Sequence, residues 1–184
     1  MESERLVLRS WTDDDAPALL EIAKDPLVGP PCGWPVHQNV GESLNVIRKI
    51  LTGNPDEKAF AIVRKSDAKI MGNISLHRDT LRKNDRVMAL GYYLGSPYRH
   101  QGYMHEAAVT LMRFGFEELQ LEYISVEHFS FNDDSRKVIE RLGFTQTGHI
   151  PHFGLSPDGR EIDLIIYILS KDDFFRRQWY IPHS

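Results

Sequence analysis

Apolar residues recur along the chain at two periods, one near 2 and one near 3.6, and the period changes several times. Residues 5–9 alternate polar and apolar side chains, which predicts a short strand. Thr12 is a candidate N-cap for a helix that follows, and Asp25-Pro26 is a stop signal for that helix. In order, the first part of the chain predicts a strand at 5–9, a helix at 16–23, an irregular Gly- and Pro-rich loop at 28–35 and a helix with Leu44, Ile47 and Leu51 on one face.

The remainder of the chain begins with three short β-rich runs joined by polar turns, a pattern typical of an antiparallel meander. The strongest helical pattern follows them, with apolar residues at i, i+3, i+4, i+7, i+8 and i+11 from Ala108. The expected elements are strands at 59–63, 70–76 and 87–94, a helix over 108–119, a strand at 123–129, a helix around 138–142 that ends at Gly143, and strands at 144–150 and 162–169 around a turn at 157–159. This order predicts an α+β domain around one mixed sheet.

Composition and charge narrow the class of protein. The 184 residues predict one domain, with its core over about 5–170 and a tail over about 171–184 that is aromatic and basic in part. That tail is expected to cover a sheet edge, to make a dimer contact or to be loose, so either a monomer or a homodimer is possible. A net charge of −4 disfavours a nucleic-acid binder. The single cysteine, Cys32, excludes an intramolecular disulfide, and no apolar run is long enough for a bilayer, so we expect a cytoplasmic protein without membrane contact.

The segment from Leu90 to Met104 carries the most chemical information. A strand ends there, a turn with Gly and Pro follows, and the strongest helix begins. Free backbone N–H groups at a helix start form an anion site, and Gly102 would let a phosphate approach the backbone closely. An ordinary strand-to-helix turn is the alternative. The segment has neither the P-loop pattern nor the dinucleotide fingerprint.

Two motifs resemble those of the GNAT N-acetyltransferases. Arg99-x-x-Gly102-x-Met104, after Gly91-Tyr92-Tyr93-Leu94, is similar to their acetyl-CoA pyrophosphate loop, although that family has Gly or Ala where Met104 stands. Asn132-Asp133-Asp134-Ser135, followed by Leu142-Gly143-Phe144, resembles the signature of the ribosomal-protein N-terminal acetyltransferase (RimJ/RimL) branch. The resemblance runs from about Arg5 to Leu169. It implies a GNAT-like mixed, mostly antiparallel sheet of about seven strands flanked by about four helices.

The resemblance also implies a place for acetyl-CoA as co-substrate, in a cleft between the strands that end at Leu94 and near Phe129. The pantetheine arm would pair with the backbone of Tyr92, Tyr93 and Leu94. The pyrophosphate would lie on the amides of Arg99, His100, Gln101, Gly102, Tyr103 and Met104. Asn132 would contact the pantetheine arm or a water. Ser135 would lie near the thioester sulfur and assist departure of the thiolate, which makes Ser135 and Asn132 the catalytic candidates, with helix capping as the alternative for both.

The sequence alone does not identify the general base. His77, Glu127 and His128 are candidates, and a water could serve instead. Strand alternation puts Val126 and His128 on one face of their strand and Glu127 on the other, without indicating which face meets the cleft.

The acceptor side is indicated by Trp34 and His37, which lie in the stiff Gly/Pro loop. The RimJ/RimL branch often shows a Gly-Trp-x-x-His element in this region. We expect the two rings to form a wall of the amine site, with a loop anchored on the core as the alternative. We expect no metal site, because Pro151 interrupts His149-x-x-His152 and no third ligand is evident.

The resemblance therefore implies an enzyme that transfers an acetyl group from acetyl-CoA to a primary amine, with a protein N-terminus as one such acceptor. A small-molecule amine such as a polyamine, an amino acid or an antibiotic is the first alternative acceptor. A non-catalytic domain of the same fold that senses acetyl-CoA is the second alternative.

Overall fold

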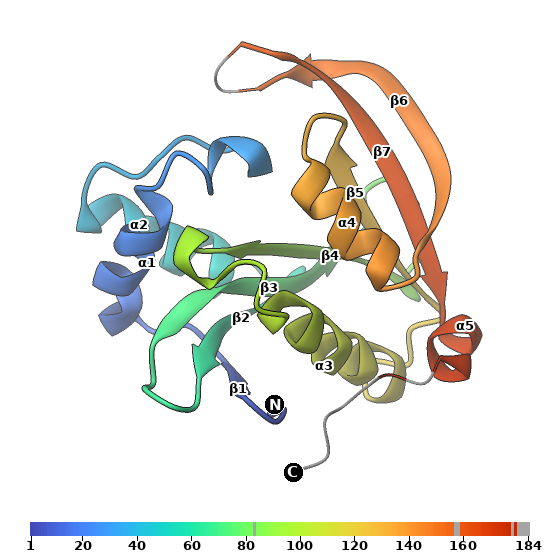
Figure 1. Cartoon of the computed structure of the whole chain (residues 1–184), viewed down its shortest axis with the longest axis horizontal. Helices are drawn as coiled ribbons and strands as arrows, with labels where there is room; N and C mark the ends of the chain where they lie inside the picture. Colours follow the sequence, from blue (N-terminus) through green and yellow to red (C-terminus); the bar gives the residue numbers. More distant parts are fainter. Residues whose placement is uncertain (83, 157–158, 178, 180–184) are drawn as a thin grey trace.

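One seven-stranded sheet organises the molecule, with strand order β1-β2-β3-β4-β5-β7-β6 (Figure 1). The structure is a computed structural model that describes residues 1–82, 84–156, 159–177 and 179. The strands are β1 Leu6–Arg9, β2 Glu57–Arg64, β3 Ile70–Arg78, β4 Val87–Leu94, β5 Tyr123–Phe129, β6 Thr145–Leu155 and β7 Glu161–Ser170. The β4–β5 pair is parallel and the other described pairs are antiparallel. The predicted mixed, mostly antiparallel sheet is confirmed.

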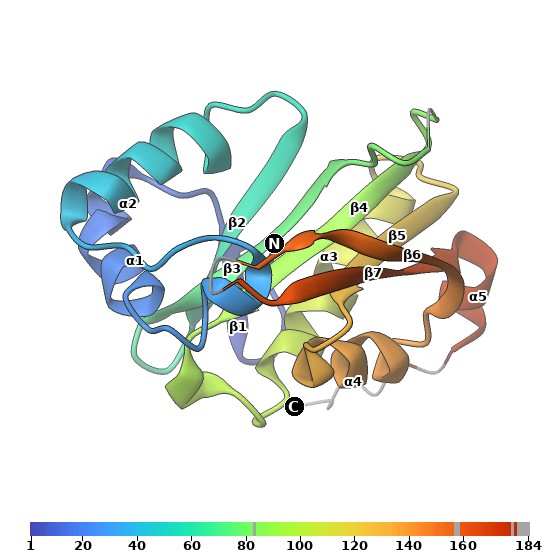
Figure 2. The same cartoon turned by 90° about the horizontal axis from the view of Figure 1, so that it is seen from above.

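Helices cover both faces of this sheet (Figure 2). They are α1 Ala16–Ala23, α2 Val40–Val46, α3 Tyr103–Glu117, α4 Asp133–Arg141 and α5 Lys171–Arg176. A π-helical turn, Ile47–Leu51, continues α2, and its end is closed by Thr52, whose backbone N–H and hydroxyl both donate to the carbonyl of Ile47 at 2.9 Å. No helix in the described ranges is both long and apolar enough to cross a bilayer.

Two apolar clusters hold the layers together. On one face, α3 and α4 pack on apolar residues of the central strands, such as Ile74, Leu76 and Ile124, which have no exposed surface. On the other face, α1 and the π-helical turn pack mainly on small residues of β2, including Ala59 and Ala61. Because β3 is covered on both faces, its polar residues Asn73 and Ser75 are buried on the α1/α2 side.

The parallel pair separates early, and this positions the site. β4 and β5 are paired from Val87↔Tyr123 to Ala89↔Ser125, yet β4 runs on to Leu94 and β5 to Phe129. Each strand keeps its outer partner, because β3 stays paired with β4 up to Leu94, and β7 with β5 up to Phe129. A wedge therefore opens in the middle of the sheet, at the place where the resemblance implied the cofactor cleft.

The hydrophobic core reaches past residue 170, the boundary expected from the sequence. Phe174 of α5 has no exposed surface, and its ring lies 5.1 Å from that of Phe116 and 4.9 Å from that of Trp179. The start of the expected tail is thus part of the core on the α3 side. The expected turn at 157–159 lies mostly outside the described residues, and the remainder of the tail beyond Trp179 lies wholly outside them.

Candidate active site

Two cavities meet in the wedge between β4 and β5. A cavity of about 930 Å³, here called the donor cavity, lies toward the start of α3 and α4. A cavity of about 660 Å³, here called the acceptor cavity, lies on the α1/α2 face of the sheet. The two share a wall, here called the junction, which consists of Pro31, Cys32, Tyr92, Tyr93, Asn132 and Ser135. Two ligands that fill these cavities would therefore both contact the junction.

The start of α3 presents unpaired backbone donors to the donor cavity. Gly102 is the N-cap residue, with φ of 81°, a conformation that glycine adopts without steric cost. Within the described part of the chain, no backbone N–H from His100 to His105 donates to another backbone group or to a side chain. Such N–H groups, together with the positive end of the helix dipole, suit an anion. Gln101 has no place in the cavity lining, because its side chain amide donates to the carbonyl of Pro97.

Side chains near this turn fix its shape. The Arg99 guanidinium donates to the carbonyls of Leu94 and Leu27, at 3.2 and 2.7 Å, and so ties the loop after α1 to the end of β4. The Met104 side chain is buried in the core that α3 covers. Its size is therefore accommodated on the core side, and its backbone N–H stays available. This explains why a large residue can stand where the related motif has Gly or Ala.

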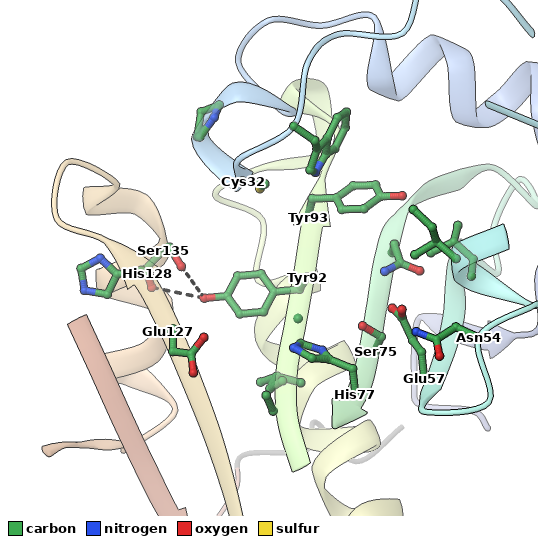
Figure 3. Close-up of a pocket in the computed structure, with 18 of the residues that line it drawn as sticks. Cys32, Asn54, Glu57, Ser75, His77, Tyr92, Tyr93, Glu127, His128 and Ser135 are labelled. Atoms are coloured by element: carbon green, nitrogen blue, oxygen red, sulfur yellow. Dashed lines mark hydrogen bonds between the residues drawn. The ribbon is translucent and has the colours of Figure 1, made fainter. Parts of the chain in front are cut away.

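Asn132 and Ser135 occupy the start of α4 and make different contacts. The Asn132 carbonyl oxygen accepts from the backbone N–H of Ser135 at 3.1 Å, so Asn132 is the N-cap of the helix. Its amide also donates to the carbonyl of Pro31 at 3.0 Å. The Ser135 hydroxyl lies 2.9 Å from the Tyr92 hydroxyl, which also donates to the Ser135 carbonyl at 3.3 Å (Figure 3). This Tyr92–Ser135 pair crosses the wedge at the junction.

The loop after α1 closes the junction from above. Its 3-10 turn, Pro30–Cys32, is held by the bond from Asn132, and Gly33 lies against the ring of Phe129. Cys32 retains exposed surface, but the protein atoms around its thiol raise the pKa to about 11 from the model-peptide value of 9.0. The thiol is thus neutral near pH 7, and a neutral thiol is a poor nucleophile.

Trp34 and His37 both line the acceptor cavity. The indole of Trp34 lies 5.4 Å from the ring of Tyr93, edge to face, and 5.4 Å from the imidazole of His37. His37 is held by Ser43, whose hydroxyl lies 2.8 Å from Nδ1, and burial lowers the pKa of its imidazole despite the opposing charge of Glu42. Trp34 also packs against the α1 core cluster, so it forms part of the cavity wall and anchors the loop as well.

The three candidates for the general base have different surroundings. The acceptor cavity is lined by Glu127, His77 and His128, but His128 is buried, with its ring on the face of β5 opposite Glu127 and its Nε2 3.3 Å from the Tyr167 hydroxyl (Figure 3). Burial raises the pKa of Glu127, the charge of Asp79 adds to this rise, and Arg82 opposes it. Burial lowers the pKa of His77, against the opposing charges of Glu57 and Asp79. Glu127 and His77 are therefore the two candidates placed to receive a proton in the cavity.

A row of polar residues lines the cavity floor, and of these the sequence analysis named His77 alone. Ser75 and His77 lie on β3, Glu57 is the register partner of His77 on β2, and Asn54 precedes that strand. Gly91 keeps the floor open, because a Cβ there would lie 3.1 Å from Ser75 Oγ and 3.2 Å from the His77 ring. The available signal was the i, i+2 spacing of Asn73, Ser75 and His77 within an otherwise apolar strand.

The two histidines near the end of β6 take separate partners. His149 Nε2 lies 2.8 Å from Asp163, and His152 contacts Glu161. In the described ranges no group of three His, Cys, Asp or Glu side chains could hold a metal ion.

Comparisons with known proteins agree with this geometry. Residues 5–145 match the family model described as an acetyltransferase (GNAT) domain. The chain is 33% identical over 113 residues to the putative ribosomal N-acetyltransferase YdaF of Bacillus subtilis (strain 168), an alignment that covers 61% of this chain and 57% of that protein. It is 22% identical over 173 residues to the uncharacterized N-acetyltransferase YoaA of the same organism, which covers 93% and 96% of the two chains. A GNAT-family acetyltransferase structure from Bacillus anthracis has a TM-score of 0.82 at 22% identity and covers 94% of this chain and 98% of that chain.

Proposed function

Because this chain belongs to the GNAT family of N-acetyltransferases, we propose that its two joined cavities hold acetyl-CoA and a primary amine for one direct transfer. The junction is the observation that carries the proposal. It lets the donor and the acceptor meet while each remains in its own cavity. Holding both reactants in contact is a large part of what such an enzyme must supply.

The residues of the donor cavity fit acetyl-CoA. The free N–H groups from His100 to Met104 suit its pyrophosphate, and Gly102 leaves the backbone accessible. The strand β4 from Leu90 to Leu94 has no partner on the β5 side, so its backbone can pair with an extended amide chain. This assigns the backbone of Tyr92, Tyr93 and Leu94 to the pantetheine arm, and Arg99 to shaping the loop.

Bound acetyl-CoA supplies the acetyl group as a thioester. At the junction, the Ser135 hydroxyl is placed to donate a proton or a hydrogen bond to the departing sulfur, and Tyr92 is placed to restore it through their 2.9 Å contact. Burial raises the pKa of Tyr92, so its phenol carries its proton at neutral pH. Asn132 fixes the start of α4 against the loop that contains Pro31, and so keeps Ser135 in position for this contact.

A neutral amine is the nucleophile, so an acceptor that arrives as an ammonium must lose a proton. Glu127 is our choice for the group that receives it, directly or through a water. A carboxyl whose pKa is raised by burial is a stronger base than an ordinary one. His77 is the alternative in the same cavity, and His128 is the least suited because Nδ1 and Nε2 already have partners.

The acceptor class proposed is a protein N-terminus, with Trp34 and His37 as one wall of its site. Support comes from YdaF, which is described as a putative ribosomal N-acetyltransferase. A small-molecule amine is the alternative, and an acetyl-CoA sensor without turnover is a further one.

The test follows the release of CoA thiol from acetyl-CoA with a panel of N-terminal peptides and small amines. Thiol release that depends on an amine, with the acetylated amine identified by mass, is the expected result. Acetyl-CoA binding without such release would favour the sensor. The Trp34→Ala variant is assayed in parallel, and a rise in KM for the amine alone would support its place in the wall.

A further inference from the structure

The acceptor cavity contains a second polar group of residues, away from the junction, that the proposed transfer does not use. This group is Asn54, Glu57 and Ser75, here called the far floor. Figure 3 shows these three residues together on one side of the cavity, with Glu127 and Ser135 on the other side and His77 between. They come from β2, β3 and the turn before β2, so the fold brings them together from separate segments.

The acidic group of the far floor has no hydrogen-bond or ion-pair partner among the described residues. The Glu57 carboxylate is half-buried, and within the described part of the chain no side chain or backbone donor makes a hydrogen bond or ion pair with it. Neighbouring charges are already paired, because Arg78 lies 3.7 Å from Asp56 at the exposed rim. A half-buried carboxylate without a partner attracts a cation.

Ser75 provides independent support. It is only 3% exposed, and among the described residues its hydroxyl makes no hydrogen bond. No fully enclosed side-chain polar atom lacks a partner in those ranges, so the Ser75 oxygen opens onto the cavity. Gly91 preserves this opening, since a Cβ there would lie 3.1 Å from that oxygen. The fold thus keeps a buried hydroxyl unpaired and accessible from the cavity.

Glu57 and Ser75 select a ligand that only donates hydrogen bonds, whereas the Asn54 amide oxygen already accepts from the backbone N–H of Asp56. A carboxylate accepts, and the Ser75 hydroxyl can accept, while an ammonium donates three hydrogen bonds and accepts none. His77 adjoins the far floor, and burial lowers the pKa of its ring, so near pH 7 the neutral imidazole does not repel a cation. Val46, Ile50 and Leu51 line the same cavity and offer apolar surface to a hydrocarbon chain.

We propose that the far floor binds a second cationic group of the acceptor, so that the preferred substrate carries two positive charges joined by an aliphatic chain. This inference rests on the proposed acetyl transfer. The strand register sets the separation between the far floor and β4 at the junction. Glu57 lies two strands from β4, roughly 10 Å across the sheet. Along the strands it lies two residues from the position paired through Ser75 with Gly91, roughly 7 Å. The Glu57 side chain shortens that span, and several methylene groups bridge it. A short diamine and a peptide N-terminus followed by lysine share this chemistry.

The experiment compares matched acceptors. We measure kcat/KM for 1,5-diaminopentane against pentylamine, and for a peptide beginning Ala-Lys against one beginning Ala-norleucine. We expect at least a tenfold preference for one dicationic member over its partner, since a bond to a charged group commonly contributes that much. The pair that shows the preference identifies the source of the second cation.

Variants test whether the preference for a dicationic acceptor depends on Glu57. Glu57→Gln is expected to remove the preference by lowering kcat/KM for the dicationic acceptor, with less than a twofold change for the monoamine. Glu118→Gln removes an exposed charge that lines neither cavity, and it is expected to retain the preference. Equal loss for both acceptors in Glu57→Gln, or no preference in the wild type, overturns the inference.

Calorimetry separates this inference from the proposed function. Titration of 1,5-diaminopentane and pentylamine into the protein without acetyl-CoA measures binding independently of turnover. If no amine releases thiol but the diamine binds at least tenfold more tightly than pentylamine in a Glu57-dependent manner, the proposed acetyl transfer is contradicted and cation binding at the far floor is supported. If amines are acetylated without any preference that depends on Glu57, the acetyl transfer is supported and cation binding at the far floor is contradicted. If neither occurs, both proposals are overturned.

Discussion

Asn132 and Ser135 lie three residues apart, yet their side chains act on different parts of the molecule. Asn132 caps α4 and secures the Pro31 carbonyl, so its contacts are structural. Ser135 makes no cap with its side chain, and its hydroxyl instead pairs with Tyr92 across the wedge. Capping therefore accounts for Asn132 but leaves the orientation of Ser135 unexplained, which supports a role for Ser135 in the transfer.

The first prediction concerns this serine. If Ser135 assists departure of the sulfur, Ser135→Ala should lower kcat by roughly 10- to 1000-fold and change KM for acetyl-CoA much less. Loss of one hydrogen bond should lower the free energy of unfolding by only about 1 kcal/mol. Steady-state kinetics and urea unfolding measure the two effects.

Tyr92→Phe gives the matched control because it removes the partner oxygen and keeps the ring. Tyr92→Phe should lower kcat in the wild type but add little in the Ser135→Ala background, since the two hydroxyls act as one pair. Additive losses would show that they act separately, and a normal kcat in both single variants would remove the pair from the reaction.

The second prediction concerns the pH dependence that Glu127 confers. A base must be ionised, and burial raises the pKa of Glu127 above its ordinary value of 4.5. Activity should therefore fall as the pH drops through that raised pKa, and the acid limb of kcat/KM should lie above 4.5. Glu127→Gln should lower kcat/KM by roughly 10²- to 10⁴-fold and abolish that limb.

His77→Gln is the comparison for this limb, because burial moves the pKa of His77 in the other direction, below 6.5. An acid limb that survives in Glu127→Gln but disappears in His77→Gln would assign the proton to His77 and contradict our choice.

Residues of the site differed in how far the sequence could reveal them. Gly102, Asn132 and Ser135 stand in local motifs, so the resemblance of these motifs to the GNAT signature indicated them, and the helical patterns that follow placed them near the start of α3 and α4. Glu57 and Ser75 meet only because β2 pairs with β3, a register that spacing along the chain does not specify. Alternation on β5 separated Glu127 from His128 but could not orient either, since orientation depends on which face α3 covers.

At the scale of the element, the start of α3 is built by neighbours as much as by its own residues. Glu106 accepts from Ser3 and from the backbone and side chain of Arg5, and Arg5 in turn donates to the Gln101 carbonyl at 3.1 Å. The N-terminal segment thus holds the turn before α3 in place, while the N–H groups of that turn stay free of other described groups.

The third prediction tests that turn. A Cβ at Gly102 would meet only the Arg5 guanidinium, at 3.4 Å, so the cost of Gly102→Ala is mainly its positive φ, about 1–2 kcal/mol of stability. We expect at least a tenfold weaker affinity for acetyl-CoA, measured by calorimetry, because relief of that strain moves the N–H groups. Gly159→Ala has a similar φ of 83° in open space and is the matched control. Equal, unchanged affinities in both variants would contradict the proposed phosphate site.

Elements with strong periodicity were predictable, and those defined by distant contacts were not. The apolar stripe of α3 and the Gly143 stop of α4 are local signals, and both helices are present. The π-helical turn after α2 is closed by the local bonds from Thr52 to Ile47, which leave no mark on the apolar pattern, and α5 is too short for its pattern to stand out. A helix of that length is stabilised by what it packs against.

At the scale of the whole molecule, one face of the sheet contains most of the hydrophobic core and the other contains the acceptor cavity. The α3/α4 face contains the main core, while the α1/α2 face uses small residues and leaves room for the acceptor cavity. The wedge between β4 and β5 connects the two faces. Stability and the site therefore draw on largely different residues, and variants of the core should impair folding before they alter substrate preference.

The last prediction tests that separation at α5, in the segment that the sequence assigned to a tail. Phe174 has no exposed surface and packs on Phe116 of α3, so Phe174→Ala should lower the free energy of unfolding by about 3–5 kcal/mol. Phe175 is its matched neighbour, and because it is 44% exposed, Phe175→Ala should cost about 1 kcal/mol or less. Urea unfolding measures both, and KM for acetyl-CoA and amine, taken well below the melting temperature, should stay within about twofold because neither residue lines a cavity. Similar small losses in both variants would show that the segment from 171 onward is dispensable, and that the core ends near residue 170 after all.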